Sequence, residues 1–290
     1  MRISPAMLVA ATAAAFALIL PVTEAGAAKP SGARSRYASC LYTSRTDPQA
    51  ALLLAQGWRD NGGGLPAAHC LSIALVRQGR FAEAAGTLEE VAAHMKLGGY
   101  FFFGEEKADR PLLAELYAQA GNAWLLADEP QKAYEDFTNA LGIVPARSGE
   151  IVEYLIDRAR SLAALDNFEQ AVADLKKAEK RADGRIEIHV FMASAYRQLG
   201  QFEPAEAELV KAFNISEENR EALLERGNLH RQAGDAGGAL LDWIKLVRLH
   251  PDTEAALAAR ANLKAMGISP EDWKGLEEVE VTGQKRPTQK

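Results

Sequence analysis

Apolar and small residues recur three, four and seven positions apart along most of the chain, and one such pattern occurs twice within 186–253, at a spacing of 34 residues. Each copy predicts two amphipathic helices, because residues at these spacings lie on one face of an α-helix. A glycine separates the two helices, Gly200 in the first copy and Gly234 in the second. The pattern therefore predicts a repeated helix–turn–helix unit.

The same register extends over five units, which begin at residues 65, 114, 152, 186 and 220. Small residues at the eighth and twentieth places would let the two helices of a unit approach closely, and larger side chains there would push them apart. The eighth-place residues are Ser72, Gly121, Ala159, Ala193 and Gly227, and the twentieth-place residues are Ala84, Ala133, Ala171, Ala205 and Ala239. The second helices carry large apolar residues at Leu88, Phe137, Leu175, Leu209 and Trp243.

A unit of this length with these small residues resembles the tetratricopeptide repeat (TPR) family. The resemblance implies an all-α fold, a TPR-type α-solenoid of antiparallel helix pairs wound into a right-handed superhelix. Residues 254–267 carry one further amphipathic pattern, and a solenoid needs such a helix to cover its last unit. We therefore expect a C-terminal capping helix.

The register divides the chain into ten segments. Within the second of these, residues 29–46 are predicted to be extended, and a single unpaired helix is predicted after Asp47-Pro48, which has the residues of a helix start. The segments are a signal peptide (1–28), a leader and N-terminal helix (29–64), TPR unit 1 (65–98), an aromatic insert (99–113), TPR unit 2 (114–151), TPR unit 3 (152–185), TPR unit 4 (186–219), TPR unit 5 (220–253), the capping helix (254–267) and a disordered tail (268–290).

The N-terminal segment has the composition of an export signal. Arg2 precedes an apolar stretch over Ala6–Val22, and the small residues Ala25–Ala28 follow with the spacing that a signal peptidase recognises. This predicts cleavage near Ala27/Ala28 and a periplasmic or secreted protein without an integral membrane segment. An uncleaved membrane anchor is the alternative, although the stretch is short for a span.

Cys40 and Cys70 are the only cysteines, and export would place them in an oxidising compartment, so an intramolecular disulfide is predicted. A catalytic pair of His69 and Cys70 is disfavoured, because adjacent residues on a helix point in different directions. The five histidines lack the spacing of metal ligands. We therefore expect no catalytic residues, no metal site and no cofactor.

Two arginines replace the leucine that is usual at the seventh place, and a buried arginine needs an acidic partner. We expect Arg158 to pair with Asp136 or Asp174. We expect Arg226 to pair with Glu208 or Asp242.

In TPR proteins the first helices line a groove that binds a partner protein or peptide. The resemblance carries this role to the second, fifth, ninth, twelfth and thirteenth places of each unit. The second place is an acidic row of Glu115, Glu153, Glu187 and Glu221, and the predicted partner-binding residues are Asn122, Arg160, Arg197, Asn228 and Arg231. A merely solvated helix face is the alternative.

The resemblance implies a non-catalytic protein–protein interaction scaffold or adaptor, which we place in the bacterial cell envelope. The alternative is an accessory regulator of an envelope hydrolase or of an outer-membrane, TonB-linked system. A net charge of −6 argues against a nucleic-acid partner.

Two short segments could serve either structure or binding. The aromatic run Tyr100–Phe103 either tucks against the array or anchors a partner. Residues 279–283 alternate like a strand that could pair with a partner's sheet edge, or they belong to a disordered tail.

Overall fold

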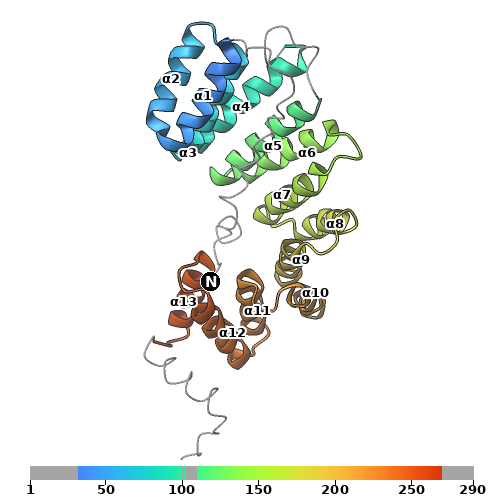
Figure 1. Ribbon diagram of the computed structural model, residues 1–290. Coiled ribbons are helices and arrows are strands. Elements are labelled where there is room, and N and C mark those ends of the chain that lie inside the picture. The colour runs from blue at the N-terminus through green and yellow to red at the C-terminus, as the bar shows by residue number, and fades with distance from the viewer. Residues whose placement is uncertain (1–31, 100, 102–109, 270–290) are drawn as a thin grey trace, which may run out of the picture. The chain divides into compact units, whose positions relative to one another are not determined.

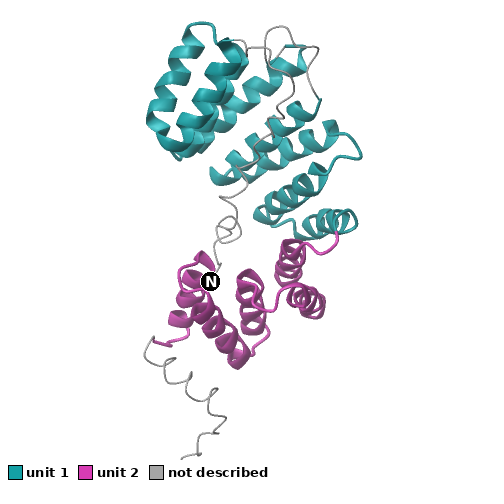
Figure 2. Ribbon diagram, in the orientation of Figure 1, with its two compact units in different colours: residues 1–182 teal, residues 183–290 magenta. Residues whose placement is uncertain are grey.

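The computed structural model describes residues 32–99, 101 and 110–269, and every regular element in them is an α-helix (Figure 1). The helices are α1 (Gly32–Thr46), α2 (Pro48–Asp60), α3 (Gly64–Arg77), α4 (Phe81–Lys96), α5 (Arg110–Leu126), α6 (Pro130–Ile143), α7 (Glu150–Ala164), α8 (Phe168–Glu179), α9 (Ile186–Gln198), α10 (Phe202–Ile215), α11 (Arg220–Gln232), α12 (Ala236–Leu249) and α13 (Glu254–Ala265). They belong to two compact units, residues 1–182 and 183–290 (Figure 2). The all-α prediction is confirmed.

The first unit stacks α1 to α8 so that each helix packs against the next one in sequence. Its core contains the large second-helix residues Leu88, Phe137 and Leu175, all of them buried. The small residues are required where predicted: a Cβ atom added at Gly121 would lie 2.9 Å from Cζ of Phe137. Close approach of the paired helices therefore depends on the small residue at this place.

The second unit stacks α9 to α13. A Cβ atom added at Gly227 would lie 2.4 Å from Nε1 of Trp243, so the same close approach recurs here. Helix α13 packs against α11 and α12, and its Leu263 joins the buried cluster around Trp243 and Leu246. The predicted C-terminal capping helix is thus confirmed.

The turns inside the helix pairs depend on a left-handed residue. Gly79, Gly200 and Gly234 have φ values of 73°, 71° and 88°. Asp128 and Asp166 take the same conformation at 60° and 59°, which few residues other than glycine adopt readily. One tight turn geometry therefore serves five helix pairs, with aspartate in place of glycine in two of them.

The N-terminal prediction is wrong in one respect. Residues from Gly32 to Thr46 form the helix α1 rather than an extended leader, and α2 is not unpaired, because α1 packs against both α2 and α3. Asp47 alone joins the two helices, and its side chain caps α2 by accepting a hydrogen bond of 2.9 Å from the backbone nitrogen of Ala50. The array therefore contains a further helix pair ahead of the first predicted unit.

The predicted disulfide joins Cys40 of α1 to Cys70 of α3, with a Cα–Cα distance of 6.2 Å. Both residues are buried. Helix α5 begins at Arg110, inside the segment predicted as an insert over 99–113. The export signal, three of the four insert aromatics and the tail residues 279–283 lie outside the described residues. Within the described part, no helix is long and apolar enough to cross a membrane.

Candidate functional site: the face of the first helices

The five predicted partner-binding residues lie on the first helices of four helix pairs. In the first unit, α5 carries Asn122 and α7 carries Arg160. In the second unit, α9 carries Arg197, and α11 carries both Asn228 and Arg231.

In the first unit, Asn122 and Arg160 converge on one carboxylate, that of Asp157. Asn122 donates from Nδ2 to Oδ2 of Asp157 at 3.3 Å, and Arg160 donates from one terminal nitrogen to Oδ1 at 2.8 Å. Burial raises the pKa of Asp157, while Arg160 and Asn122 oppose this rise because they stabilise the charged form. The Arg160 side chain is only 5% exposed, so its charge is neutralised inside the array.

In the second unit, Arg197 forms a buried ion pair. Its Nε donates to Oε1 of Glu225 at 2.5 Å, and a terminal nitrogen donates to Oε1 of Gln232 at 2.9 Å. Asn228 accepts a hydrogen bond of 3.0 Å at Oδ1 from Nδ2 of Asn262 in the capping helix. Arg231, by contrast, is exposed.

These contacts share a pattern that sequence reasoning missed, because it considered other places of the unit. In four of the TPR units, the residue at the sixth place of the first helix is bonded to the first helix of the preceding helix pair. We call these bonds the sixth-place contacts. They are the disulfide from Cys40 to Cys70 and the hydrogen bonds from His69 to Gln119, from Asn122 to Asp157 and from Arg197 to Glu225. The available signal was a set of cysteine, amide and carboxylate side chains recurring at one place of the register.

The contact of His69 belongs to a longer polar chain that joins three helices. Gln119 donates from Nε2 to Oε1 of Glu115 at 2.9 Å, so its own oxygen accepts from Nε2 of His69, also at 2.9 Å. Nδ1 of His69 is then the acceptor for the Tyr37 hydroxyl at 2.6 Å. Burial lowers the pKa of His69, which agrees with a neutral imidazole in this role.

Phe101 is the one described residue among the insert aromatics, and it is buried. Its ring lies edge-on to the rings of Tyr37 and His69, with centroid distances of 5.6 and 5.7 Å. Phe101 therefore packs against the array and is not available as an exposed anchor.

The two predicted arginine pairs are confirmed, and the structure selects one partner for each. Arg158 binds Asp174 through two nitrogens at 2.7 and 3.0 Å, and Arg226 binds Asp242 in the same way at 2.9 and 2.6 Å. Each ion pair links the two helices of one TPR unit, α7 to α8 and α11 to α12. Such paired charges act in packing rather than in ligand contact.

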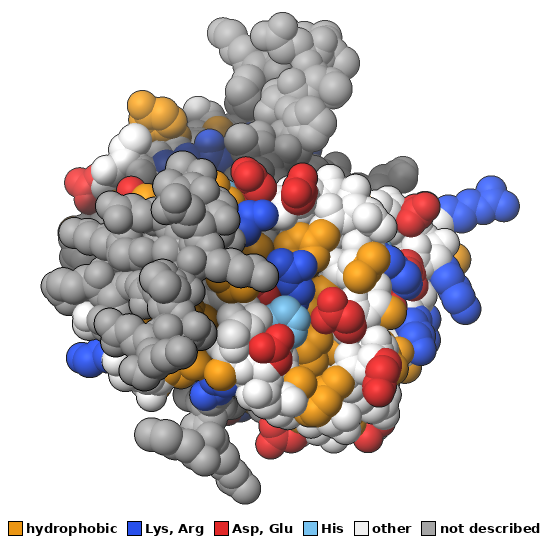
Figure 3. Space-filling view, turned by 90° about the horizontal axis from the view of Figure 1, so that it is seen from below, with side chains coloured by type: hydrophobic (Ala, Val, Ile, Leu, Met, Phe, Trp, Pro, Cys, Tyr) orange, Lys and Arg blue, Asp and Glu red, His pale blue; other side chains and the backbone are white. Residues whose placement is uncertain are grey.

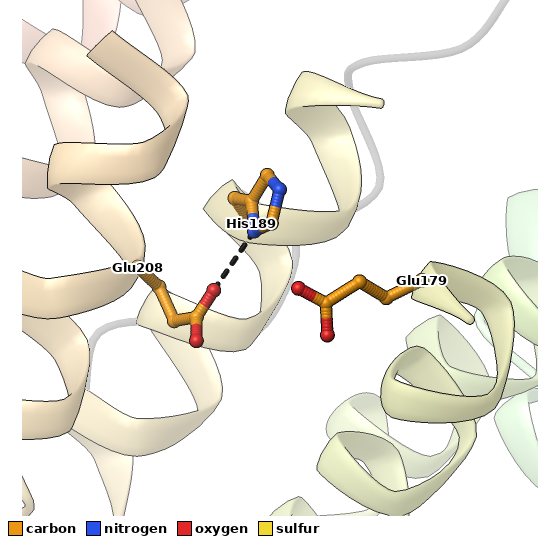
Figure 4. Close-up of side chains that lie close together, drawn as sticks. All are labelled: Glu179, His189 and Glu208. Atoms are coloured by element: carbon orange, nitrogen blue, oxygen red, sulfur yellow. Dashed lines mark hydrogen bonds and ion pairs between the residues drawn. The ribbon is translucent and has the colours of Figure 1, made fainter. Parts of the chain in front are cut away.

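His189 links the two helices of one repeat through a polar contact. The imidazole is buried on α9, and its Nδ1 lies 2.8 Å from Oε2 of Glu208 on α10 (Figure 4). Lys211 donates to the other oxygen of Glu208 at 3.0 Å. Glu179, also drawn in Figure 4, belongs to α8 of the first unit.

The molecular face seen in Figure 3 carries acidic and basic side chains interspersed with apolar ones. On its described part, neither sign of charge forms a continuous field. A mixed surface of this kind suits local recognition of polar and charged groups better than long-range attraction of a polyanion.

Comparison with known proteins gives one match to a family. Residues 186–219, which contain α9 and α10, match the family model described as tetratricopeptide repeat. No curated protein matches the sequence.

Solved structures share the fold at low sequence identity. They include pilF of Pseudomonas aeruginosa, with 13% identity over 80% of this chain and 100% of that chain at a TM-score of 0.54. TTC0263 of Thermus thermophilus has 18% identity over 70% of this chain and 98% of its own at 0.51. MamA of Desulfovibrio magneticus RS-1 has 19% identity over 66% and 97% at 0.51. The chain thus matches the tetratricopeptide-repeat model at 186–219, and its antiparallel helix pairs have the fold of tetratricopeptide-repeat solenoids.

Proposed function

We propose that this chain is a non-catalytic scaffold or adaptor of the bacterial cell envelope, which binds a partner protein or peptide on the face of its first helices. TPR folds in general serve protein interaction rather than catalysis, which supports the coarser part of the proposal. The envelope location rests on the predicted export signal over 1–28.

The sixth-place contacts carry this proposal. Each one fixes a polar or charged side chain of a first helix by a bond to the neighbouring first helix within the same compact unit. A face whose polar groups are already held in place loses little conformational entropy when a ligand binds, so it is suited to recognition.

The five proposed partner-binding residues then divide into two kinds. Arg231 is exposed and can contact a partner directly. Asn122 and Asn228 are partly buried, and Arg160 and Arg197 sit in ion pairs whose carboxylates are Asp157 and Glu225, where they hold the face in shape.

This division dictates the test. Replacing Arg160 or Arg197 would leave the carboxylate of Asp157 or Glu225 without its cation, at a cost of up to about 3–5 kcal/mol, and would confuse loss of folding with loss of binding. Arg231→Glu avoids this problem because its side chain is exposed, and Arg248→Glu on the second helix α12, also exposed, is the matched control.

Partners would first be captured by crosslinking in envelope extract, and their affinities then measured with purified proteins. Arg231→Glu is expected to weaken binding about tenfold, or roughly 1.4 kcal/mol, whereas Arg248→Glu should leave it unchanged. Equal affinity of both variants and the wild type would remove the first-helix face from the proposal.

The location has its own test. Protein recovered from the periplasm or medium should begin just after Ala27 or Ala28 when its N-terminus is sequenced. Recovery of the uncleaved chain from the cytoplasm alone would contradict the envelope role.

A further inference from the structure

Four second helices carry an acidic residue directly before their large buried apolar residue. These residues are Asp136, Asp174, Glu208 and Asp242. All four are buried, and a buried carboxylate is tolerated only with a partner that stabilises its charge.

Three of the four have such partners. Asp174 binds Arg158 and also Lys177, which lies three residues further along α8. Glu208 binds Lys211 at the same spacing together with His189. Asp242 binds Arg226.

Asp136 lacks both kinds of cation. The seventh place of its own unit, where Arg158 and Arg226 stand in theirs, is Ala120. The position three residues further along the helix, where Lys177 and Lys211 stand, is Asn139. Its environment therefore differs in kind from that of the other three acids.

Asp136 faces a second carboxyl instead. After burial, the largest cause that raises the pKa of Asp136 is the negative charge of Glu89 on α4, and a hydrogen bond between the two carboxyls adds to it. One oxygen of Glu89, Oε1, accepts a hydrogen bond of 2.7 Å from the indole Nε1 of Trp124. Oδ2 of Asp136 is buried, and none of the described residues donates to it.

Two carboxylates cannot hydrogen-bond each other, because each offers only acceptors, but a protonated carboxyl can donate to a carboxylate. We propose that Asp136 carries a proton on Oδ2 at neutral pH and shares it with Glu89 through a hydrogen bond. Loss of this shared proton at higher pH then acts as a switch that loosens the packing of α4, α5 and α6. The shared proton replaces the cation that the three equivalent acids possess.

The charged and titratable groups around the pair agree with this assignment. Helix α4 contributes Glu89 itself, and α5 contributes Tyr117, whose pKa is raised by burial, by Asp136 and by Glu89. Helix α6 adds Glu135, which raises the pKa of Asp136, and Lys132, which lies over the Trp124 ring at 4.2 Å and pairs with Glu129 at 3.6 Å. Arg158 of α7 is committed to Asp174 and Thr138, so it does not neutralise the pair.

Burial, Glu89 and Glu135 together raise the pKa of Asp136 to about 8, against 3.8 for an ordinary aspartate. Between about pH 4 and pH 8, Asp136 is therefore protonated in the folded state and ionised in the unfolded chain. By linkage, the contribution of the pair to stability is greatest below about pH 4 and declines as the pH rises to about 8.

The test compares urea unfolding of the full chain from pH 5 to pH 9 in wild type, Asp136→Asn and Glu89→Gln. Both variants replace the shared proton by an amide donor. The unfolding equilibrium constant of the wild type, relative to Asp136→Asn, is expected to rise by up to tenfold for each pH unit up to about pH 8. Asp174→Asn is the matched control: it should destabilise the protein at neutral pH, because it removes the carboxylate that pairs with Arg158.

Infrared spectra provide a readout that does not depend on unfolding. A protonated carboxylic acid band should be present in the wild type at pH 7, absent in Asp136→Asn, and lost from the wild type as the pH passes about 8. If Asp136→Asn does not fold, the test rests on the pH dependence of unfolding of Glu89→Gln and on the infrared spectra of the wild type. Parallel pH profiles for wild type and the folded variant, or absence of the band, would overturn the proposal.

Discussion

The N-terminal end of the first unit and the C-terminal end of the second solve the same problem in different ways. A terminal helix must cover the core of the repeat that it adjoins. Helix α13 does so with buried apolar and small residues, Ala256, Ala259 and Leu263. Helix α1 offers only Cys40 and Ser44 as fully buried residues, and it is held by the disulfide and by the hydrogen bond from Tyr37 to His69.

This difference explains why the sequence predicts the terminal helix at one end of the array and not at the other. The buried residues of the capping helix recur at helical spacing in the sequence, so this helix was predicted correctly. A helix fastened by one covalent bond and one polar chain carries little periodic signal, so α1 was mistaken for an extended leader. Four predictions, in order of expected effect, test whether the two ends are truly held by different interactions.

Removing the disulfide should have the largest effect. The double variant Cys40→Ser, Cys70→Ser should lower the free energy of unfolding of the first unit by roughly 3–4 kcal/mol, as chain entropy predicts for a loop of this length. Hydrogen exchange should accelerate in α1 and α2 and stay unchanged in α12 and α13. Two free thiols in unreduced exported protein would contradict the disulfide itself.

At the other end, Leu263→Ala should create a cavity beside Trp243 and cost about 2–3 kcal/mol, in the lower part of the range for buried leucine because a terminal helix can relax inward. Exchange should accelerate in α13 while α1 keeps its protection. The exposed Leu257 on the same helix is the control, and Leu257→Ala should change the urea midpoint little.

Acid should weaken the N-terminal end selectively. The folded pKa of His69 lies below its unfolded value, so the unfolded state binds more protons below about pH 6.5, and stability falls as the pH decreases, by at most about 1.4 kcal/mol per pH unit. His69→Gln should remove this component, whereas the exposed His94→Gln should retain it. Urea midpoints at pH 7 and pH 5 measure the difference, and equal shifts in both variants would dissociate the effect from His69.

The smallest effect concerns the polar contact of the capping helix. Asn262→Ala should cost about 0.5–1.5 kcal/mol, because Asn228 loses its partly buried partner. Lys264→Ala, at an exposed position of the same helix, should fall within about 0.5 kcal/mol of the wild type. A loss at Asn262 as large as that at Leu263 would mean that polar contacts hold this end too.

At the candidate site, the sequence predicted which residues need a partner but not which partner each one has. The sequence indicated that Arg158 needs an acidic partner but left Asp136 and Asp174 open. The choice depends on which second helix faces the arginine, and Asp174 lies on the partner helix of the same unit. Asn122 and Arg160 were expected to face a ligand, yet both converge on Asp157, a residue that their own places in the register do not identify.

Spacing and composition were enough to predict the helices of the five repeats, the capping helix, the small residues between paired helices and, because the chain has only two cysteines, the disulfide. Each of these depends on spacing along one or two helices or on simple counting. Only the folded chain shows that residues 32–46 form a helix, that Asn122 bonds to Asp157 and Arg197 to Glu225, and that Asp136 meets Glu89 instead of a cation. These features join side chains on separate helices, often a full repeat or more apart in sequence, so they depend on how the helices pack and not on local periodicity.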